Sequence, residues 1–378
     1  MNPLQGLQEY GQSVWLDYIR RDLMENGELR RLIADDGLRG MTSNPAIFEK
    51  AIADSTLYDT AFAAMPDRSA DTKARYEHVA LRDIQQAADT LRPVYDSTQR
   101  RDGYVSLEVS PYLAHDTAAT LAEARRLWAA VGRENVMIKV PGTPEGIPAV
   151  EQLISEGLNI NVTLLFAQEV YERVAEAFIR GIEKRAAAGK DVRHVASVAS
   201  FFISRIDTLV DAQLSARLKS ATGSERDRLQ SLLGKVAIAN GKLTYERYGK
   251  IFSGPRWEKL QRQGAQAQRV LWASTSTKNP SYRDVLYVEE LIGPDTVNTI
   301  PPATFDAFRD HGRLRQSLTE DVPAARQTMD ALAQAGISMQ DATAKLLDDG
   351  VRLFAEAFDK LLAAVERKSA TVAQRASA

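Results

Sequence analysis

Short runs of apolar and β-branched residues alternate with longer segments of helical periodicity, and this alternation limits the possible folds most. The runs are apolar nearly throughout, as parallel strands buried on both faces are. We expect strands at residues 13–19, 37–43, 104–110, 136–141, 159–166, 194–202, 269–274 and 296–301. Strands that alternate with helices favour βαβ units. These eight runs predict an α/β protein with a single closed (β/α)8 TIM barrel, a fold that typically takes about 250 residues.

The chain has 378 residues, and the surplus over such a barrel falls in three places. Residues 44–103 and 206–268 form long second and sixth crossovers that we expect to carry additional helices, and the region from about residue 323 predicts terminal helices. We therefore expect one catalytic barrel domain over residues 1–368 and a flexible tail at 369–378. A doubly wound open sheet is the competing architecture, but no segment carries the G-x-G-x-x-G nucleotide fingerprint.

Composition argues against several kinds of chemistry. The chain has no cysteine, which excludes disulfides, thiolate metal sites and a cysteine nucleophile. Its four histidines are scattered, so we expect no metal and no cofactor. A net charge of −2 gives no reason to expect nucleic acid, and no apolar run approaches the roughly 20 residues that span a membrane. The N-terminus has no signal-peptide pattern, so we expect a cytoplasmic protein.

Lys139 stands inside one of the expected apolar strands, in NVMIKVPGTPEGIPAV. Burying an ammonium group is costly, so burial favours the neutral amine, which can form a Schiff base with a carbonyl substrate. Pro141 and Gly142 follow at once. Lys139 should therefore lie near the carboxyl end of its strand, where the active sites of such barrels assemble. The alternative is a lysine that extends from a strand end to solvent.

Polar residues also occur near the ends of other expected strands, namely Asp17, Glu108, Asn161, Thr163 and Arg205. Unsatisfied polar groups are unfavourable inside strands, so these side chains should converge on one another or on a ligand. Each also has a structural explanation. Asp17 can cap a helix, Glu108 can pair with a basic residue, and Arg205 can form a surface salt bridge. Asn161 and Thr163 can satisfy loop backbone.

Five segments resemble motifs of the transaldolase family, in the family's order and spacing. RGMTSNPAIFEK (39–50) resembles the N-terminal signature, in which a Thr-x-Asn-Pro turn closes the second strand. VMIKVPGTPEGIPAV (136–150) is similar to the signature around the Schiff-base lysine, and NVTLLF (161–166) to the fifth-strand element. SLEVSP and SFFISR join them. The resemblance spans about residues 13–301, and the chain length is similar to the longer bacterial form of this class I Schiff-base aldolase superfamily.

The resemblance implies an enzyme of the non-oxidative pentose phosphate pathway that transfers dihydroxyacetone from sedoheptulose 7-phosphate to glyceraldehyde 3-phosphate. The products would be erythrose 4-phosphate and fructose 6-phosphate. It implies Lys139 as the nucleophile and Asp17 as the acid/base at the carbon-4 hydroxyl. Glu108 and Thr163 are implied as the pair that positions a water for carbinolamine dehydration. The implied substrate-binding residues are Thr42, Asn44, Asn161, Ser200 and Arg205, the last as a phosphate ligand.

The sequence departs from the family in one place. Many members follow the seventh strand with an S-x-R element that holds phosphate, whereas this chain has WASTSTKNPSYRD (272–284). Ser274 matches the serine, but Ser276 stands where the arginine would be. Lys278 is the expected substitute, and Arg283 is the other candidate.

Three other functions are compatible with parts of this pattern. An aldolase of the same superfamily would release free dihydroxyacetone. A non-catalytic sugar-phosphate-binding barrel would keep Arg205 and Ser274 but have no use for Lys139 or Asp17. A helical scaffold would explain the C-terminal half but not the alternating strands. Sugar phosphates are the expected partners, without nucleic acid or membrane, and both a monomer and a homodimer fit the sequence.

Overall fold

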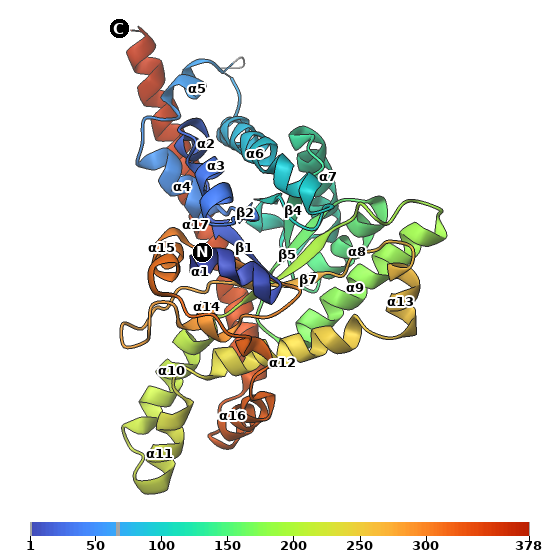
Figure 1. Ribbon diagram of the computed structural model, residues 1–378. Coiled ribbons are helices and arrows are strands. Elements are labelled where there is room, and N and C mark those ends of the chain that lie inside the picture. The colour runs from blue at the N-terminus through green and yellow to red at the C-terminus, as the bar shows by residue number, and fades with distance from the viewer. Residues whose placement is uncertain (1, 66–68, 378) are drawn as a thin grey trace.

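The computed structural model describes residues 2–65 and 69–377, and within them eight parallel strands close into a barrel (Figure 1). The strands follow one another in chain order, and the last pairs with the first. They are β1 (Gln12–Asp17), β2 (Gly40–Thr42), β3 (Tyr104–Glu108), β4 (Val136–Pro141), β5 (Ile160–Leu165), β6 (Ser197–Phe202), β7 (Arg269–Ala273) and β8 (Thr296–Ile300). The predicted (β/α)8 barrel is confirmed.

The strands are shorter than predicted wherever buried apolar residues continue into a loop. β4 has the predicted bounds, but β1 ends at Asp17, two residues before the expected end. Ile19 and Leu38 are fully buried although both lie outside strands. These side chains fill the space between barrel and helices without joining the ladder of hydrogen bonds, so apolar character alone extends a predicted strand too far.

Helices surround the barrel and fill both long crossovers. The second crossover carries α4, α5 and α6, and the sixth carries α10 to α13. The helices are α1 (Pro3–Gly6), α2 (Arg21–Glu25), α3 (Glu28–Asp35), α4 (Pro45–Ala53), α5 (Asp59–Ala63), α6 (Thr72–Ser97), α7 (Thr117–Val131), α8 (Gly146–Glu156), α9 (Gln168–Ala187), α10 (Ser204–Leu218), α11 (Gly223–Leu232), α12 (Val236–Ile251), α13 (Pro255–Gln261), α14 (Leu286–Glu290), α15 (Pro302–His311), α16 (Val322–Gln334) and α17 (Met339–Ser377), with short 3₁₀ turns η1 (Leu7–Tyr10), η2 (Pro111–Leu113) and η3 (Ser317–Thr319).

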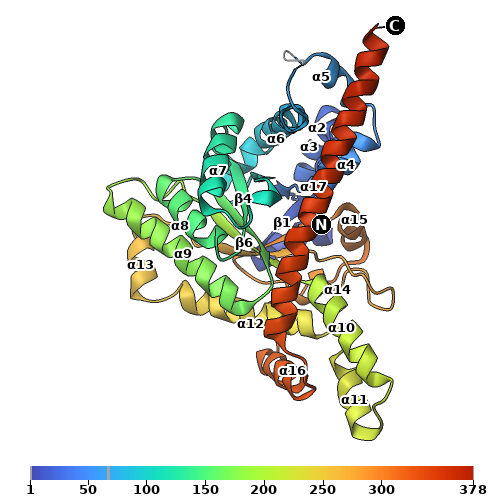
Figure 2. The same cartoon turned by 180° about the vertical axis from the view of Figure 1, so that it is seen from behind.

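The long helix α17 crosses the barrel and packs on both α4 and α10 (Figure 2). It lies against the carboxyl end of β5, where Leu164 has a left-handed φ of 61° at an irregularity in the strand. Gly350 allows this approach, because a Cβ at that position would stand 2.9 Å from a methyl carbon of Leu164. The tail expected at 369–378 is helical as far as Ser377, and Ala378 lies outside the described residues.

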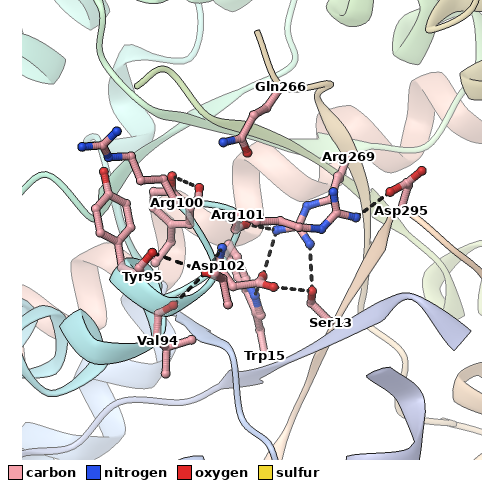
Figure 3. A network of polar contacts seen from close by, with 12 residues as sticks. Ser13, Trp15, Val94, Tyr95, Arg100, Arg101, Asp102, Gln266, Arg269 and Asp295 are labelled. Carbon is pink, nitrogen blue, oxygen red and sulfur yellow. Dashed lines mark hydrogen bonds and ion pairs between the residues drawn. The ribbon is translucent and has the colours of Figure 1, made fainter. Parts of the chain in front are cut away.

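A buried ion pair ties β7 to the loop before β3 at the amino end of the barrel (Figure 3). Arg269 Nη2 donates to Asp102 Oδ1 at 2.9 Å, and Arg269 Nη1 donates to Ser13 Oγ at 2.8 Å. Ser13 Oγ and Trp15 Nε1 donate to the same carboxylate, at 2.7 and 3.2 Å. Burial alone would raise the pKa of Asp102, but Arg269 and these hydrogen bonds outweigh it and hold the pKa below its usual value.

We expect Arg269→Ala to lower the free energy of unfolding by about 3–5 kcal/mol, because it leaves a buried carboxylate without its counter-charge. Urea unfolding at neutral pH measures this loss. Arg101→Ala is the matched control, since the Arg101–Asp295 pair at the same end of the barrel is about half exposed and should contribute only about 0–1 kcal/mol. Equal losses in the two variants would contradict the assignment.

The pH dependence of stability provides a second test of the Asp102–Arg269 pair. Because the pKa of Asp102 is lowered in the folded protein, its stabilisation is present above the ordinary carboxyl pKa and is lost as the pH falls through the lowered one. The difference between wild type and Arg269→Ala should therefore shrink in acid.

Candidate active site

The register of the barrel strands brings Lys139 and Glu108 side by side. Glu108 on β3 is the cross-strand neighbour of Lys139 on β4, and Lys139 is in turn the neighbour of Asn161 on β5. Lys139 Nζ lies 3.4 Å from Glu108 Oε2, and each side chain is only 6% exposed. The same amine donates to the backbone oxygen of Ser43 at 3.1 Å. Lys139 is thus a buried amine that points into the barrel, not one that extends to solvent.

Asp17 stands at the carboxyl end of β1, beside Thr42 at the end of β2. Thr42 Oγ1 donates to Asp17 Oδ1 at 2.7 Å and lies 2.6 Å from Thr299 Oγ1 on β8. Burial raises the pKa of Asp17, and the charge of Lys139 and the Thr42 hydrogen bond offset part of this rise. Asp17 does not cap a helix, because α2 begins four residues later.

Glu108 has a raised pKa for the same reason. Burial is the main cause, and the Lys139 ammonium offsets part of it. A carboxyl group with a raised pKa can both give and take a proton close to neutral pH. Two such groups therefore approach one amine from different strands.

A cavity of about 170 Å³ opens over the Lys139 amine at the carboxyl end of the strands. Its walls are formed by Asp17, Thr42, Asn44, Lys139, Thr163, Ser200, Phe202, Arg205, Ala273, Ser274, Ser276, Lys278, Thr299, Pro301 and Phe354. Nine of the eleven residues predicted from the sequence lie here together. The exceptions, Glu108 and Asn161, stand behind this surface, Glu108 against Lys139 and Asn161 against Ser200.

The amide and hydroxyl side chains of the site differ in the number of hydrogen bonds that they already form. Thr163 Oγ1 is buried and has no hydrogen-bond partner within the described residues. Asn44 Oδ1 caps α4 by accepting from the backbone nitrogen of Ile47 at 3.0 Å. Asn161 is fully buried, and its amide bonds two side-chain hydroxyls, those of Ser106 at 3.0 Å and Ser200 at 2.6 Å. Thr163 is therefore the hydroxyl best placed to accept a new partner.

Two cationic side chains, Arg205 and Lys278, line the cavity and lie close enough to affect each other. Arg205 is the second residue of α10, and no carboxylate pairs with it among the residues that the structure describes. Burial lowers the pKa of Lys278, the charge of Arg205 lowers it further, and Asp17 offsets part of the effect. Lys278 Nζ donates to Ser276 Oγ at 2.6 Å. Arg283, the other predicted candidate, instead pairs with Glu289 at 2.8 Å.

The sequence does not indicate five of the wall residues, namely Phe202, Ala273, Thr299, Pro301 and Phe354, and of these Phe354 lies farthest along the chain from the barrel strands. It belongs to α17, and its ring centre lies 5.8 Å from Lys139 Nζ and 5.9 Å from Arg205 Cζ. In the sequence it is one apolar position of an amphipathic helix, a pattern that predicts core packing equally well. Its role depends on where α17 crosses the barrel, which no local pattern indicates.

No three His, Asp or Glu side chains in residues 2–65 and 69–377 are grouped so that they could hold a metal ion. Over the same ranges, no helix combines the length and the apolar character needed to cross a membrane.

The fold and the site together define a class of protein, a (β/α)8 barrel with a buried lysine between carboxyl groups at the carboxyl end of its strands. Residues 14–365 match the family model described as Transaldolase/Fructose-6-phosphate aldolase. The chain belongs to this family.

Curated relatives match over nearly the whole of both chains. The chain is 48% identical to "Transaldolase 2" of Nostoc sp. (strain PCC 7120) over 373 residues, which cover 97% of this chain and 98% of the relative. It is 45% identical to "Transaldolase" of Thiobacillus denitrificans, covering 97% and 100% of the two chains. It is also 45% identical to "Transaldolase" of Thermobifida fusca, covering 98% and 99%.

Proposed function

We propose that this protein is a transaldolase that transfers dihydroxyacetone between sugar phosphates of the non-oxidative pentose phosphate pathway. The observation that carries the proposal is the buried Lys139 amine, held against Glu108 in the wall of a cavity that two further cations also line. Its nitrogen attacks carbon 2 of the ketose. The hydroxyl of the resulting carbinolamine takes a proton, with Glu108 as donor, and leaves as water, and the nitrogen lone pair forms the iminium bond.

Asp17 acts on the next step. It takes the proton of the carbon-4 hydroxyl, the bond between carbons 3 and 4 breaks, and its electron pair moves into the iminium to give an enamine. The aldose phosphate leaves, and a second aldose phosphate is attacked by the enamine in the reverse sequence. We propose that Thr163 orients the water of the dehydration step. Thr42, Asn44 and Ser200 would contact the three-carbon unit, with Asn161 holding Ser200.

An assay of the complete transfer reaction, with a ketose donor and an aldose acceptor, tests this function. Fructose 6-phosphate and erythrose 4-phosphate should give sedoheptulose 7-phosphate and glyceraldehyde 3-phosphate, and both products can be quantified by mass spectrometry. Free dihydroxyacetone in amounts equal to the glyceraldehyde 3-phosphate would instead identify an aldolase.

We propose Arg205 and Lys278 as the phosphate ligands, with Ser274 and Ser276 beside them. A phosphate dianion placed here meets two cations, the half-buried Arg205 and the exposed Lys278, with which it can form charge-assisted hydrogen bonds. Ser274 has a left-handed φ of 56°, and its hydroxyl lies 2.9 Å from that of Ser204, so this part of the loop is held against α10.

We expect Arg205→Ala and Lys278→Ala to raise KM for fructose 6-phosphate more than they lower kcat, because phosphate is bound in the ground and transition states alike. Arg205→Ala should also narrow the preference for fructose 6-phosphate over fructose. Steady-state kinetics measure both effects. Arg283→Ala, in the same loop but paired with Glu289, is the matched control and should keep the wild-type KM. An unchanged KM in Lys278→Ala would remove Lys278 from the phosphate site.

A further inference from the structure

Glu108 borders a second hollow in addition to its contact with Lys139. This is a narrow cleft behind β3, of about 10 Å³. Its walls come from α6, β3, α7 and α17, and they are Lys73, Tyr76, Glu77, Ala80, Leu81, Leu107, Glu108, Ser110, Glu123, Leu127 and Phe358. Glu108 Oε2 is buried and faces Lys139 Nζ at 3.4 Å, but it accepts no hydrogen bond within the described part of the chain. A volume of about 10–15 Å³ holds one water molecule where polar partners are present.

Polar groups continue from Glu108 to the outer end of the cleft. Burial, with the charges of Glu77, Glu108 and Glu123, raises the pKa of Tyr76, so its hydroxyl keeps its proton. At the outer end, Lys73 Nζ lies 2.9 Å from Glu123, and the Lys73 side chain is 37% exposed. The cleft therefore leads from a buried carboxyl group to the surface of the protein.

The outer wall also holds the loop that follows Glu108. Glu123 Oε1 accepts from the backbone nitrogen of Ser110 at 3.3 Å, and Arg126 joins Glu123 to Glu77. These ion pairs fix α6, α7 and the end of β3 relative to one another. The walls of the cleft are thus held in fixed positions by these contacts.

The reaction needs a path for water at this point. Dehydration of the carbinolamine expels one water next to the Lys139 nitrogen, in the cavity of about 170 Å³ that the sugar phosphate would occupy. Phe354 lines the same cavity, with its ring centre 5.8 Å from Lys139 Nζ and 5.9 Å from Arg205 Cζ. A molecule released there has the substrate on one side and Glu108 on the other.

We propose that the cleft behind Glu108 is a water port, which binds one water on Glu108 Oε2 and exchanges the water of iminium formation with solvent while substrate occupies the cavity. The proposal rests on the proposed function. In the forward step the carbon–oxygen bond breaks, Glu108 supplies the proton, and the water leaves past Tyr76 and Lys73. In the reverse step a water enters by the same path and returns a proton to Glu108.

Oxygen isotope exchange tests the port. When fructose 6-phosphate labelled with ¹⁸O at carbon 2 exchanges with ¹⁴C-labelled glyceraldehyde 3-phosphate, each transfer forms and hydrolyses one iminium. In wild type the released water escapes. Each transfer should therefore remove one ¹⁸O atom from the ketose, after correction for exchange without enzyme. Leu81→Phe places a larger side chain in the cleft wall, so released water should return before it escapes. We expect about a twofold or greater fall in oxygen lost per transfer.

Matched variants make the outcome decisive. Leu127→Phe narrows the cleft from the opposite wall and should act like Leu81→Phe, whereas Leu81→Ala widens it and should keep the wild-type ratio. Leu121→Phe makes the same change on α7 outside the cleft and should also keep it. One oxygen lost per transfer in both narrowed variants would overturn the port while the proposed function stands. A wild type that forms no borohydride-trapped adduct would overturn the proposed function and the port together.

Discussion

Lys139→Met is expected to abolish both transfer of the three-carbon unit and trapping of substrate by borohydride. Methionine fills a similar volume but has no amine, so neither carbinolamine nor iminium can form. The variant should fold, because the buried Glu108 can be neutralised by protonation, toward which burial already shifts it. Intact mass and a peptide map after borohydride reduction with fructose 6-phosphate measure the result. Wild type should carry the reduced adduct on Lys139, and the variant none.

Lys278→Met is the control for this experiment, since Lys278 is the other lysine on the cavity wall. It should still be trapped on Lys139, although at a higher substrate concentration. An adduct on Lys278 in wild type, or full activity in Lys139→Met, would contradict the assignment of the nucleophile.

Asp17→Asn should lower kcat by about 10²–10⁴-fold, the usual effect of removing a general acid or base. Asparagine keeps the shape of the side chain and can still accept the Thr42 hydrogen bond, but it cannot take the carbon-4 proton. KM should change little. Adduct trapping should persist, because iminium formation precedes the cleavage that Asp17 assists. Rapid-quench trapping beside steady-state kinetics separates the two steps.

The pH profile adds an independent test of Asp17. Burial raises its pKa, so the acid limb of the wild-type kcat profile should lie at higher pH than an ordinary aspartate gives. Activity should rise as the group ionises, and the residual activity of Asp17→Asn should lack that limb. A change in KM alone would mean that Asp17 binds substrate and does not transfer the proton.

The sequence predicts the barrel well because buried parallel strands have a local signature. The run at 136–141 is bounded by Pro141, and β4 has the same bounds. Polar residues at strand ends also predict that their side chains meet at one place, because the parallel strands of a barrel all end on the same face. Lys139, Asp17 and Thr163 therefore meet as expected.

Other features depend on contacts between distant segments, which a local pattern does not carry. The sequence suggests two replacements for the missing arginine, and only the folded loop places Lys278 in the cavity and pairs Arg283 with Glu289. The resemblance implies that Asn161 touches substrate. In the structure its amide group forms hydrogen bonds with Ser106 and Ser200. The path of α17, and with it Phe354, follows from packing against α4 and α10.

The position of α17 has a consequence for protein synthesis. Once Ile300 has left the ribosome, a nascent chain contains every strand of the barrel, yet Phe354 is still to be translated. The barrel can close at that stage over a pocket that lacks one wall. The pocket should therefore reach its full substrate affinity only when α17 has been made and has docked.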